Sequence, residues 1–204
     1  MFNGEGLMYK KHLKIQKIIC LLCIIASALT FLYALGMITD IYEALYNTMR
    51  NPMKPTQTRV EGSWIYYDMQ PFNKQFSNAT LIPILLACLL YITNTHTRRK
   101  YYISNFVAVG AYSAATIGIC LWAHQQIEAF AVQYMTTINF EQLKEFSDGR
   151  GTPYLDNTNM LDLHRVVFAI AIGTVVLLVG NAIWKVVLMR QEKKLLQAGE
   201  EAAV

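Results

Sequence analysis

Apolar residues along this chain gather into four long runs that are separated by polar segments. Three of these runs, residues 18–39, 101–127 and 166–184, contain no Asp, Glu, Lys or Arg. Each has the length of about twenty residues that a helix needs to cross a hydrocarbon layer of ~30 Å. A fourth run, residues 79–93, is shorter, and a short or tilted span accommodates such a mismatch at modest cost. The pattern predicts an all-α integral membrane protein with a four-transmembrane-helix bundle.

The composition supports this prediction and excludes an ordinary soluble domain. Of the 204 residues, 54% are hydrophobic and only 16% are charged, which is too apolar for a soluble protein of this length. The chain begins with a basic leader, but the apolar run behind it is longer than the core of a signal peptide, so we interpret the first run as an uncleaved anchor.

The positive charges predict the orientation of the four spans. Eleven of the eighteen Lys and Arg residues lie before the first run, in the short gap at 98–100, or after the fourth run. Ten of the fourteen acidic residues lie in the two long loops instead. Since Lys and Arg remain on the cytoplasmic side, both termini are expected in the cytoplasm.

The expected organisation follows directly from these runs and charges. Cytoplasmic segments are expected at 1–17, 98–100 and 188–204, outer loops at 40–78 and 128–163, and spans at 18–39, 79–97, 101–127 and 164–187. We expect a multi-pass protein of a plasma membrane, and a bacterial one because the outer loops contain no cysteine for disulfides.

The two outer loops are expected to fold together as a small mixed extracellular cap. Helical spacing predicts a helix after residue 39, and β-branched and aromatic residues in TRVEGSWIYYDM predict a strand or one arm of a hairpin. A further helix in NFEQLKEFSDGRG is expected to end at Gly149 or Gly151. Five loop aromatics form either the core of the cap or an exposed recognition surface: Trp64, Tyr66, Tyr67, Phe72 and Phe76.

Small residues predict where helices pack closely. Gly110, Ala114 and Gly118 recur every four residues in the third span, which lets another helix approach the backbone. We therefore expect this span to be the most buried one, with its stripe facing either a helix of the same chain or a partner. Asn181 in the fourth span is expected to form hydrogen bonds between helices.

Two pairs of polar residues at the outer ends of spans three and four are candidate metal ligands. His124 and Glu128 are four residues apart and share a helix face, while Asp162 and His164 lie where the fourth span begins. If these spans are neighbours, the four side chains form a zinc site. Otherwise the histidines bond to loops or lipid headgroups. No other cofactor is predicted.

The remaining chemistry is sparse. The sequence contains no nucleophile, zinc-protease or phosphate-loop motif and no basic aromatic surface for nucleic acid. The layout of spans and loops is similar to that of claudins and tetraspanins, but the loop cysteines of those families are missing, so the similarity implies no function.

Three functions are consistent with the sequence. The first is a noncatalytic membrane subunit or scaffold that binds other membrane proteins, or itself, through its outer loops and third span. The second is a small oligomeric transporter, channel or lipid-binding protein. The third is a membrane-embedded metalloenzyme that uses the histidine and carboxylate residues. In every case membrane lipids are the surrounding partners.

Overall fold

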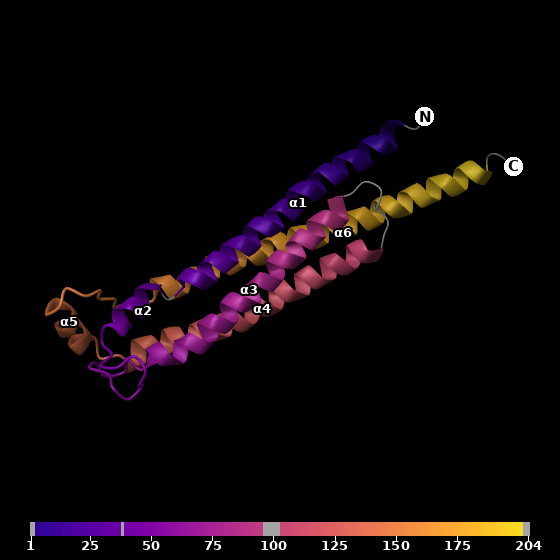
Figure 1. Ribbon diagram of the computed structural model, residues 1–204. Coiled ribbons are helices and arrows are strands. Elements are labelled where there is room, and N and C mark those ends of the chain that lie inside the picture. Colours follow the sequence, from indigo (N-terminus) through magenta and orange to yellow (C-terminus); the bar gives the residue numbers. More distant parts are fainter. Residues whose placement is uncertain (1–2, 38, 96–102, 202–204) are drawn as a thin grey trace. The chain divides into compact units, whose positions relative to one another are not determined.

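The computed structural model describes residues 3–37, 39–95 and 103–201. Within these residues the chain is almost entirely helical and contains no strand, only an isolated bridge between Met49 and Thr58. Six helices follow one another: α1 (Asn3–Gly36), α2 (Thr39–Tyr46), α3 (Ile65–Thr95), α4 (Ile103–Thr137), α5 (Phe140–Asp148) and α6 (Asn159–Glu201) (Figure 1). The predicted turn at 98–100 lies outside the described residues.

Four of the helices, α1, α3, α4 and α6, are long and apolar enough to cross a membrane. This confirms the prediction of four candidate spans and is consistent with a multi-pass membrane protein. Two of these helices extend beyond their apolar runs. Helix α3 begins at Ile65, before the run at 79–93, and α4 ends at Thr137, after the run at 101–127. Helices are favoured here because a backbone in hydrocarbon has to satisfy its hydrogen bonds internally.

The chain divides into two compact units, and the first consists of residues 1–28, 82–117 and 170–204. Its apolar core takes side chains from α1, α3, α4 and α6. Tyr112 is fully buried in this core. Its hydroxyl lies 3.2 Å from both the Cys23 carbonyl oxygen and the Ser27 hydroxyl, so a buried phenol is satisfied between α4 and α1.

The second unit consists of residues 29–81 and 118–169 and contains α2, α5 and both long connections. Its centre is a group of aromatic rings. Phe72 and Phe76 stack with ring centroids 5.6 Å apart, and Phe76 lies edge-on to Phe168 at 6.0 Å and to Trp122 at 6.3 Å. Such contacts between rings contribute about 0.5–1.5 kcal/mol each beyond their buried area.

The strand predicted in TRVEGSWIYYDM is wrong. The residues before 65 form turns, and α3 begins at Ile65. The buried residues Ile65, Met69, Phe72 and Phe76 recur at intervals of three or four, so helical periodicity prevails over the β-propensity of the individual residues.

The helices predicted in both loops are confirmed. In α2 the residues at helical spacing, Ile41, Ala44 and Leu45, are buried. In α5 the Asn139 side chain accepts a hydrogen bond from the Gln142 backbone N–H at 3.1 Å, and the helix ends at Gly149. Asn139 is thus the N-cap of α5, and Gly149 is its C-cap.

The two connections bind each other through backbone groups. The Asn139 N–H donates to the Glu61 carbonyl, and the Glu61 N–H donates to the Gln142 side-chain oxygen, both at 3.0 Å. Gly62 lies between these bonds with φ +83°, and a Cβ there would meet the Thr137 carbonyl group and would be 2.8 Å from the Ile138 Cα. Only glycine fits both the backbone conformation and the space.

The expectation that the third span is the most buried one is wrong. In its apolar window α4 has 28% of its residues buried, against 44% for the first span and 33% for each of the other two. Gly110, Ala114 and Gly118 are all exposed, and a Cβ on either glycine would meet nothing within 4 Å. The stripe therefore packs against no helix in the described part of this chain.

We predict that Gly62→Ala destabilises the protein by more than about 2 kcal/mol, because a side chain there displaces backbone atoms of α4. The matched control is Gly151→Ala, whose φ is +62° but which has no neighbour within 4 Å; its cost is about 1 kcal/mol from backbone strain alone. Thermal unfolding in one detergent compares the two variants. Equal losses would contradict the close approach at Gly62.

Candidate metal centre

The start of α6 places three functional side chains, Asp162, His164 and Arg165, within about one turn of helix. The Thr158 carbonyl accepts the first intrahelical hydrogen bond, from the Asp162 N–H at 2.8 Å, and the Thr158 hydroxyl donates to the Asp162 carboxylate at 2.8 Å. An acidic residue in the first turn is favoured by the helix dipole. His164 and Arg165 follow directly, so their positions are fixed by where the helix begins.

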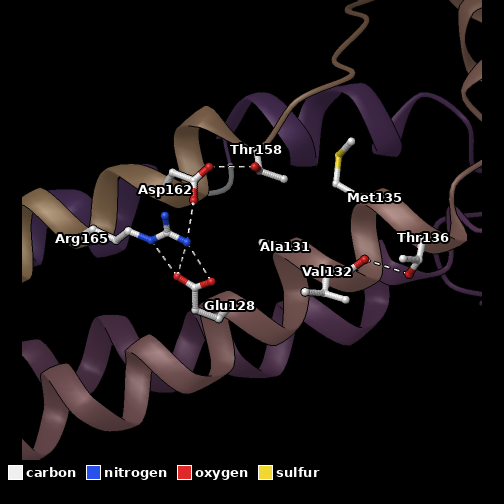
Figure 2. A pocket seen from close by; sticks show the side chains of 8 residues that line it. All are labelled: Glu128, Ala131, Val132, Met135, Thr136, Thr158, Asp162 and Arg165. Carbon is white, nitrogen blue, oxygen red and sulfur yellow. Dashed lines mark hydrogen bonds and ion pairs between the residues drawn. The ribbon is translucent and has the colours of Figure 1, made fainter.

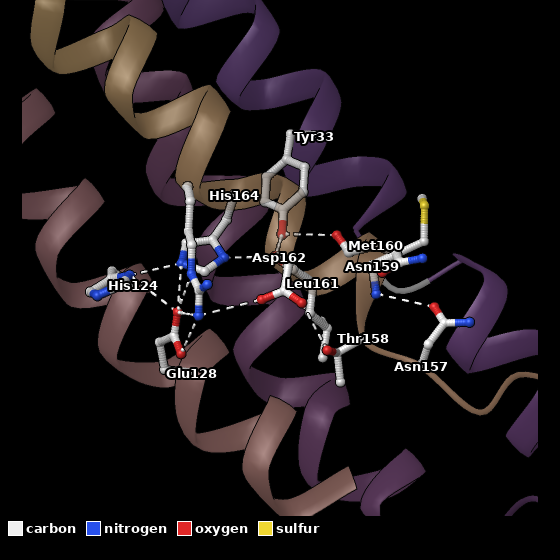
Figure 3. Close-up of polar contacts among 11 residues, drawn as sticks. Tyr33, His124, Glu128, Asn157, Thr158, Asn159, Met160, Leu161, Asp162 and His164 are labelled. Atoms are coloured by element: carbon white, nitrogen blue, oxygen red, sulfur yellow. Dashed lines mark hydrogen bonds and ion pairs between the residues drawn. The ribbon is translucent and has the colours of Figure 1, made fainter. Parts of the chain in front are cut away.

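His124, Glu128 and His164 form a compact group with one ligand atom each (Figure 3). The His124 Nδ1 is 2.7 Å from the His164 Nε2. The Glu128 Oε1 is 3.9 Å from the first nitrogen and 3.5 Å from the second. Two residues one turn apart on α4 thus meet a third from α6, and the sequence prediction that these three side chains share a site agrees with this geometry.

The ring of His164 is held in one orientation. Its Nδ1 lies 2.6 Å from the Leu161 carbonyl oxygen, which can only accept, so Nδ1 carries the hydrogen. In the neutral ring the lone pair is therefore on Nε2, the atom that faces His124 and Glu128. The Tyr33 hydroxyl from α1 donates to the same carbonyl at 3.0 Å.

Burial differs strongly across the group. The His164 side chain is 1% exposed, the Glu128 side chain 33% and the His124 side chain 48%. His164 also lies edge-on to Phe168, with ring centroids 5.3 Å apart. The group therefore has a rigid, buried member and two members that solvent can reach.

Arg165 donates hydrogen bonds to both carboxylate oxygens of Glu128. Its Nε donates to Oε1 at 2.9 Å and its Nη2 to Oε2 at 3.0 Å, a bidentate pair (Figure 2). The same Nη2 is 3.4 Å from the Asp162 Oδ1. One guanidinium thus holds two carboxylates, and bidentate geometry is the strongest form of this contact.

Asp162, the fourth predicted ligand, is not a member of the compact group. Its carboxylate is shared between the Thr158 hydroxyl and the Arg165 guanidinium. Figure 2 shows it on the far side of the guanidinium from Glu128. The structure therefore brings three of the four predicted residues together and connects the fourth to them through Arg165.

An open pocket of about 420 Å³ adjoins the group. Glu128, Asp162 and Arg165 form its charged side, and the remaining residues are apolar or hydroxyl-bearing (Figure 2). They are Ala131, Val132, Met135, Thr136 and Thr158. The pocket gives molecules from outside access to the carboxylate of Glu128.

The other predicted site residues lie elsewhere. Of the five loop aromatics, Tyr66, Phe72 and Phe76 are buried, Tyr67 is half-buried, and Trp64 is exposed. Phe76 and Phe168 connect the aromatic centre of the second unit to the ring of His164. Three of the aromatics are thus core residues, and one of them, Phe76, contacts the Phe168 ring that packs against His164.

Asn181 is buried, and the interhelical contact at this residue uses its backbone. Its carbonyl oxygen lies 3.3 Å from the His12 Nε2, whereas neither side-chain polar atom has a hydrogen-bond partner among the described residues. The expected side-chain bond between helices is therefore not observed there.

Sequence reasoning missed Arg165, Leu161 and Tyr33. A signal for Arg165 was present, since it is a lone cation beside two candidate ligands at the end of an apolar run. The Leu161 carbonyl and the Tyr33 hydroxyl leave no signal in the sequence, because their roles depend on where α6 begins and on how α1 packs.

No family model, curated protein or solved structure matches this chain. Its function has to be argued from the geometry of the site.

Proposed function

We propose that this chain is a four-span membrane protein that binds a divalent transition metal ion, with zinc as the best fit, through His124, Glu128 and His164. The single observation that carries the proposal is that the three ligand atoms lie within 4.8 Å of one another. Two imidazoles and a carboxylate are a donor set that zinc uses in proteins.

The distances fit such an ion after a small adjustment. Donor atoms about 2.0–2.1 Å from a tetrahedral zinc are about 3.3–3.4 Å apart from one another. The distances from Glu128 to the two histidines, 3.9 and 3.5 Å, are near this value. The histidine pair at 2.7 Å would widen by about 0.6 Å, and His124 can move because it is half exposed.

The surroundings of His164 also support metal binding. Metal-bound histidines ordinarily donate their second ring N–H to a carbonyl or carboxylate, which fixes the tautomer. The Leu161 carbonyl takes this role here and leaves the Nε2 lone pair directed at the group. In the observed state the His124 Nδ1–H donates to this lone pair at 2.7 Å, and a bound metal ion would take the place of that hydrogen.

Arg165 competes with the metal ion for Glu128, and this gives the site a second state. In the observed state the guanidinium holds both Glu128 and Asp162. Metal binding would take the Glu128 carboxylate and leave Arg165 with Asp162 as its remaining carboxylate. In this account Asp162 is not a metal ligand. It favours metal binding because it remains a carboxylate partner for the Arg165 guanidinium when Glu128 binds the ion.

A second function is supported by a separate observation, the exposed small-residue stripe of α4. The stripe faces away from the described part of the chain, and nothing lies within 4 Å of where a Cβ would be at Gly110 or Gly118. Small residues at this spacing allow two membrane helices to approach closely. We infer that α4 binds a helix of another membrane protein or of a second copy, as a noncatalytic subunit would.

The first test measures zinc binding to the purified, tag-free protein in detergent. We expect one zinc ion per chain, with an affinity that falls on the order of 100-fold in His164→Ala and in His124→Ala because a ligand is lost. His96→Ala removes a histidine outside the described residues and is expected to change nothing. Absence of stoichiometric zinc, or unchanged affinity in His164→Ala, would exclude the metal site.

The second test is a double-mutant cycle on Asp162 and Arg165. Arg165→Gln is expected to raise zinc affinity about tenfold, since the competing guanidinium is gone. Asp162→Asn is expected to lower affinity a few-fold in the parent and to have no effect in the Arg165→Gln background. If Asp162 instead contacts the metal directly, Asp162→Asn lowers affinity in both backgrounds, and the competition account is wrong.

The third test places a leucine in the α4 stripe. A Cβ at Gly118 would have no neighbour within 4 Å and the residue is exposed, so Gly118→Leu is expected to fold while excluding a partner helix. Crosslinking in native membranes, followed by mass spectrometry, should then lose its main product. Gly180→Leu on α6 is the matched control, since a Cβ there also meets nothing within 4 Å. Loss in both variants, or in neither, would rule out a specific α4 surface.

A further inference from the structure

The C-terminal half of α6 carries two buried polar side chains on one face. Asn181 and Lys185 are one helical turn apart, and they are 6% and 4% exposed. Both belong to the first unit, far along α6 from the histidine group. A buried lysine and a buried amide side by side need partners, because burial without them is costly.

Lys185 has no acidic partner within the described residues. Its ammonium lies 5.6 Å from the centroid of the Phe106 ring, a cation–π contact, and the ion pairs formed by the described residues involve other cations. A ring face attracts a cation but does not neutralise it. The Lys185 residue is only 4% exposed, and a charge with so little access to water is stabilised by a negative group in contact with it.

The amide of Asn181 is equally unsatisfied in this part of the structure. Both its Nδ2 and its Oδ1 are buried without a hydrogen-bond partner among the described residues. Trp184, three residues after Asn181, lies edge-on to the His12 ring with ring centroids 5.0 Å apart. The amide therefore offers N–H donors and an acceptor oxygen one helical turn from Lys185.

The polar residues nearby are neutral and largely occupied with each other. Gln16 donates to the Asn94 side-chain oxygen at 2.9 Å, and Asn94 donates to the Asn105 carbonyl at 3.3 Å. The outer faces of the same stretch of α1 carry only positive charges, the exposed residues Lys10, Lys11, Lys14 and Lys17. These lysines add positive charge to the same unit as Lys185, and positive charge favours an anion as the partner.

We propose that Lys185 and Asn181 form a binding site for a phosphate-bearing anion, supplied by the headgroup of an anionic membrane phospholipid. The phosphate accepts from the Lys185 ammonium and the Asn181 amide N–H. The amide oxygen accepts from a headgroup hydroxyl, so a glycerol headgroup satisfies all three groups at once. A lysine that merely extends its ammonium toward the membrane surface would not distinguish between headgroups.

The test uses the full chain in neutral detergent with short-chain phosphatidylglycerol as the probe, and phosphatidylcholine of the same chain length as its comparison. Native mass spectrometry counts bound lipid. We expect one phosphatidylglycerol bound about tenfold more tightly than phosphatidylcholine by the unaltered protein. Lys185→Met and Asn181→Leu should remove this preference, whereas Lys185→Arg should retain it. Lys193→Met, which removes an exposed charge further along α6, should leave it unchanged.

Competition with inorganic phosphate identifies the source of the anion. A lipid site keeps its phosphatidylglycerol in millimolar phosphate, whereas displacement by phosphate would assign the site to a free anion and overturn the lipid source. Equal retention of both lipids by the unaltered protein would overturn the proposal without relying on any variant. Unchanged preference in Lys185→Met, with helicity preserved, would overturn it as well. None of these outcomes depends on whether zinc binds at the histidine group.

Discussion

The backbone of an apolar segment in hydrocarbon has no water to bond with, and this constraint underlies the structure. Every long apolar run has to be helical, since a helix satisfies its N–H and C=O groups within the segment. Once the helices are set, each polar side chain can reach only what its face of the helix meets. The possible functions of this chain therefore depend on which polar residues share a helix face. His124 pairs with Glu128, and Asn181 with Lys185, because each pair is separated by four residues.

The two proposed sites differ in how their positive charge is compensated. In the second unit Arg165 is exposed and lies against two carboxylates, so the charges are compensated within the chain. In the first unit Lys185 is buried, and among the described residues its ammonium lies over the Phe106 ring and has no carboxylate partner. A compensated group suits an exchangeable ligand that replaces one internal partner by another. An uncompensated group suits a ligand that supplies the missing charge.

Much of this could be read from the sequence, and the failures have identifiable physical causes. The helices of the four spans follow from apolar length. Spacing and position at span ends made His124, Glu128 and His164 candidates for one site, but whether the two spans are neighbours had to come from the structure. The strand at 58–69 fails because residue preferences for β-structure are weak beside a helical period that buries Ile65, Met69 and Phe72. The prediction that α4 is the most buried span fails because small residues allow a helix to approach closely but do not determine which helix approaches. The contacts of Arg165 could not be predicted, because the position of a long side chain depends on the groups that it contacts and not on its spacing in the sequence.

Tyr33 adds a consequence for communication within the second unit. Its hydroxyl and the His164 ring bond the same carbonyl oxygen of Leu161, so α1 and the histidine group share one acceptor. Thermodynamic linkage is reciprocal. If the proposed metal ion fixes the His164 ring and thereby restricts Tyr33, then restricting Tyr33 would favour metal binding by the same coupling free energy. The first helix is thus placed to sense what the third and fourth spans bind.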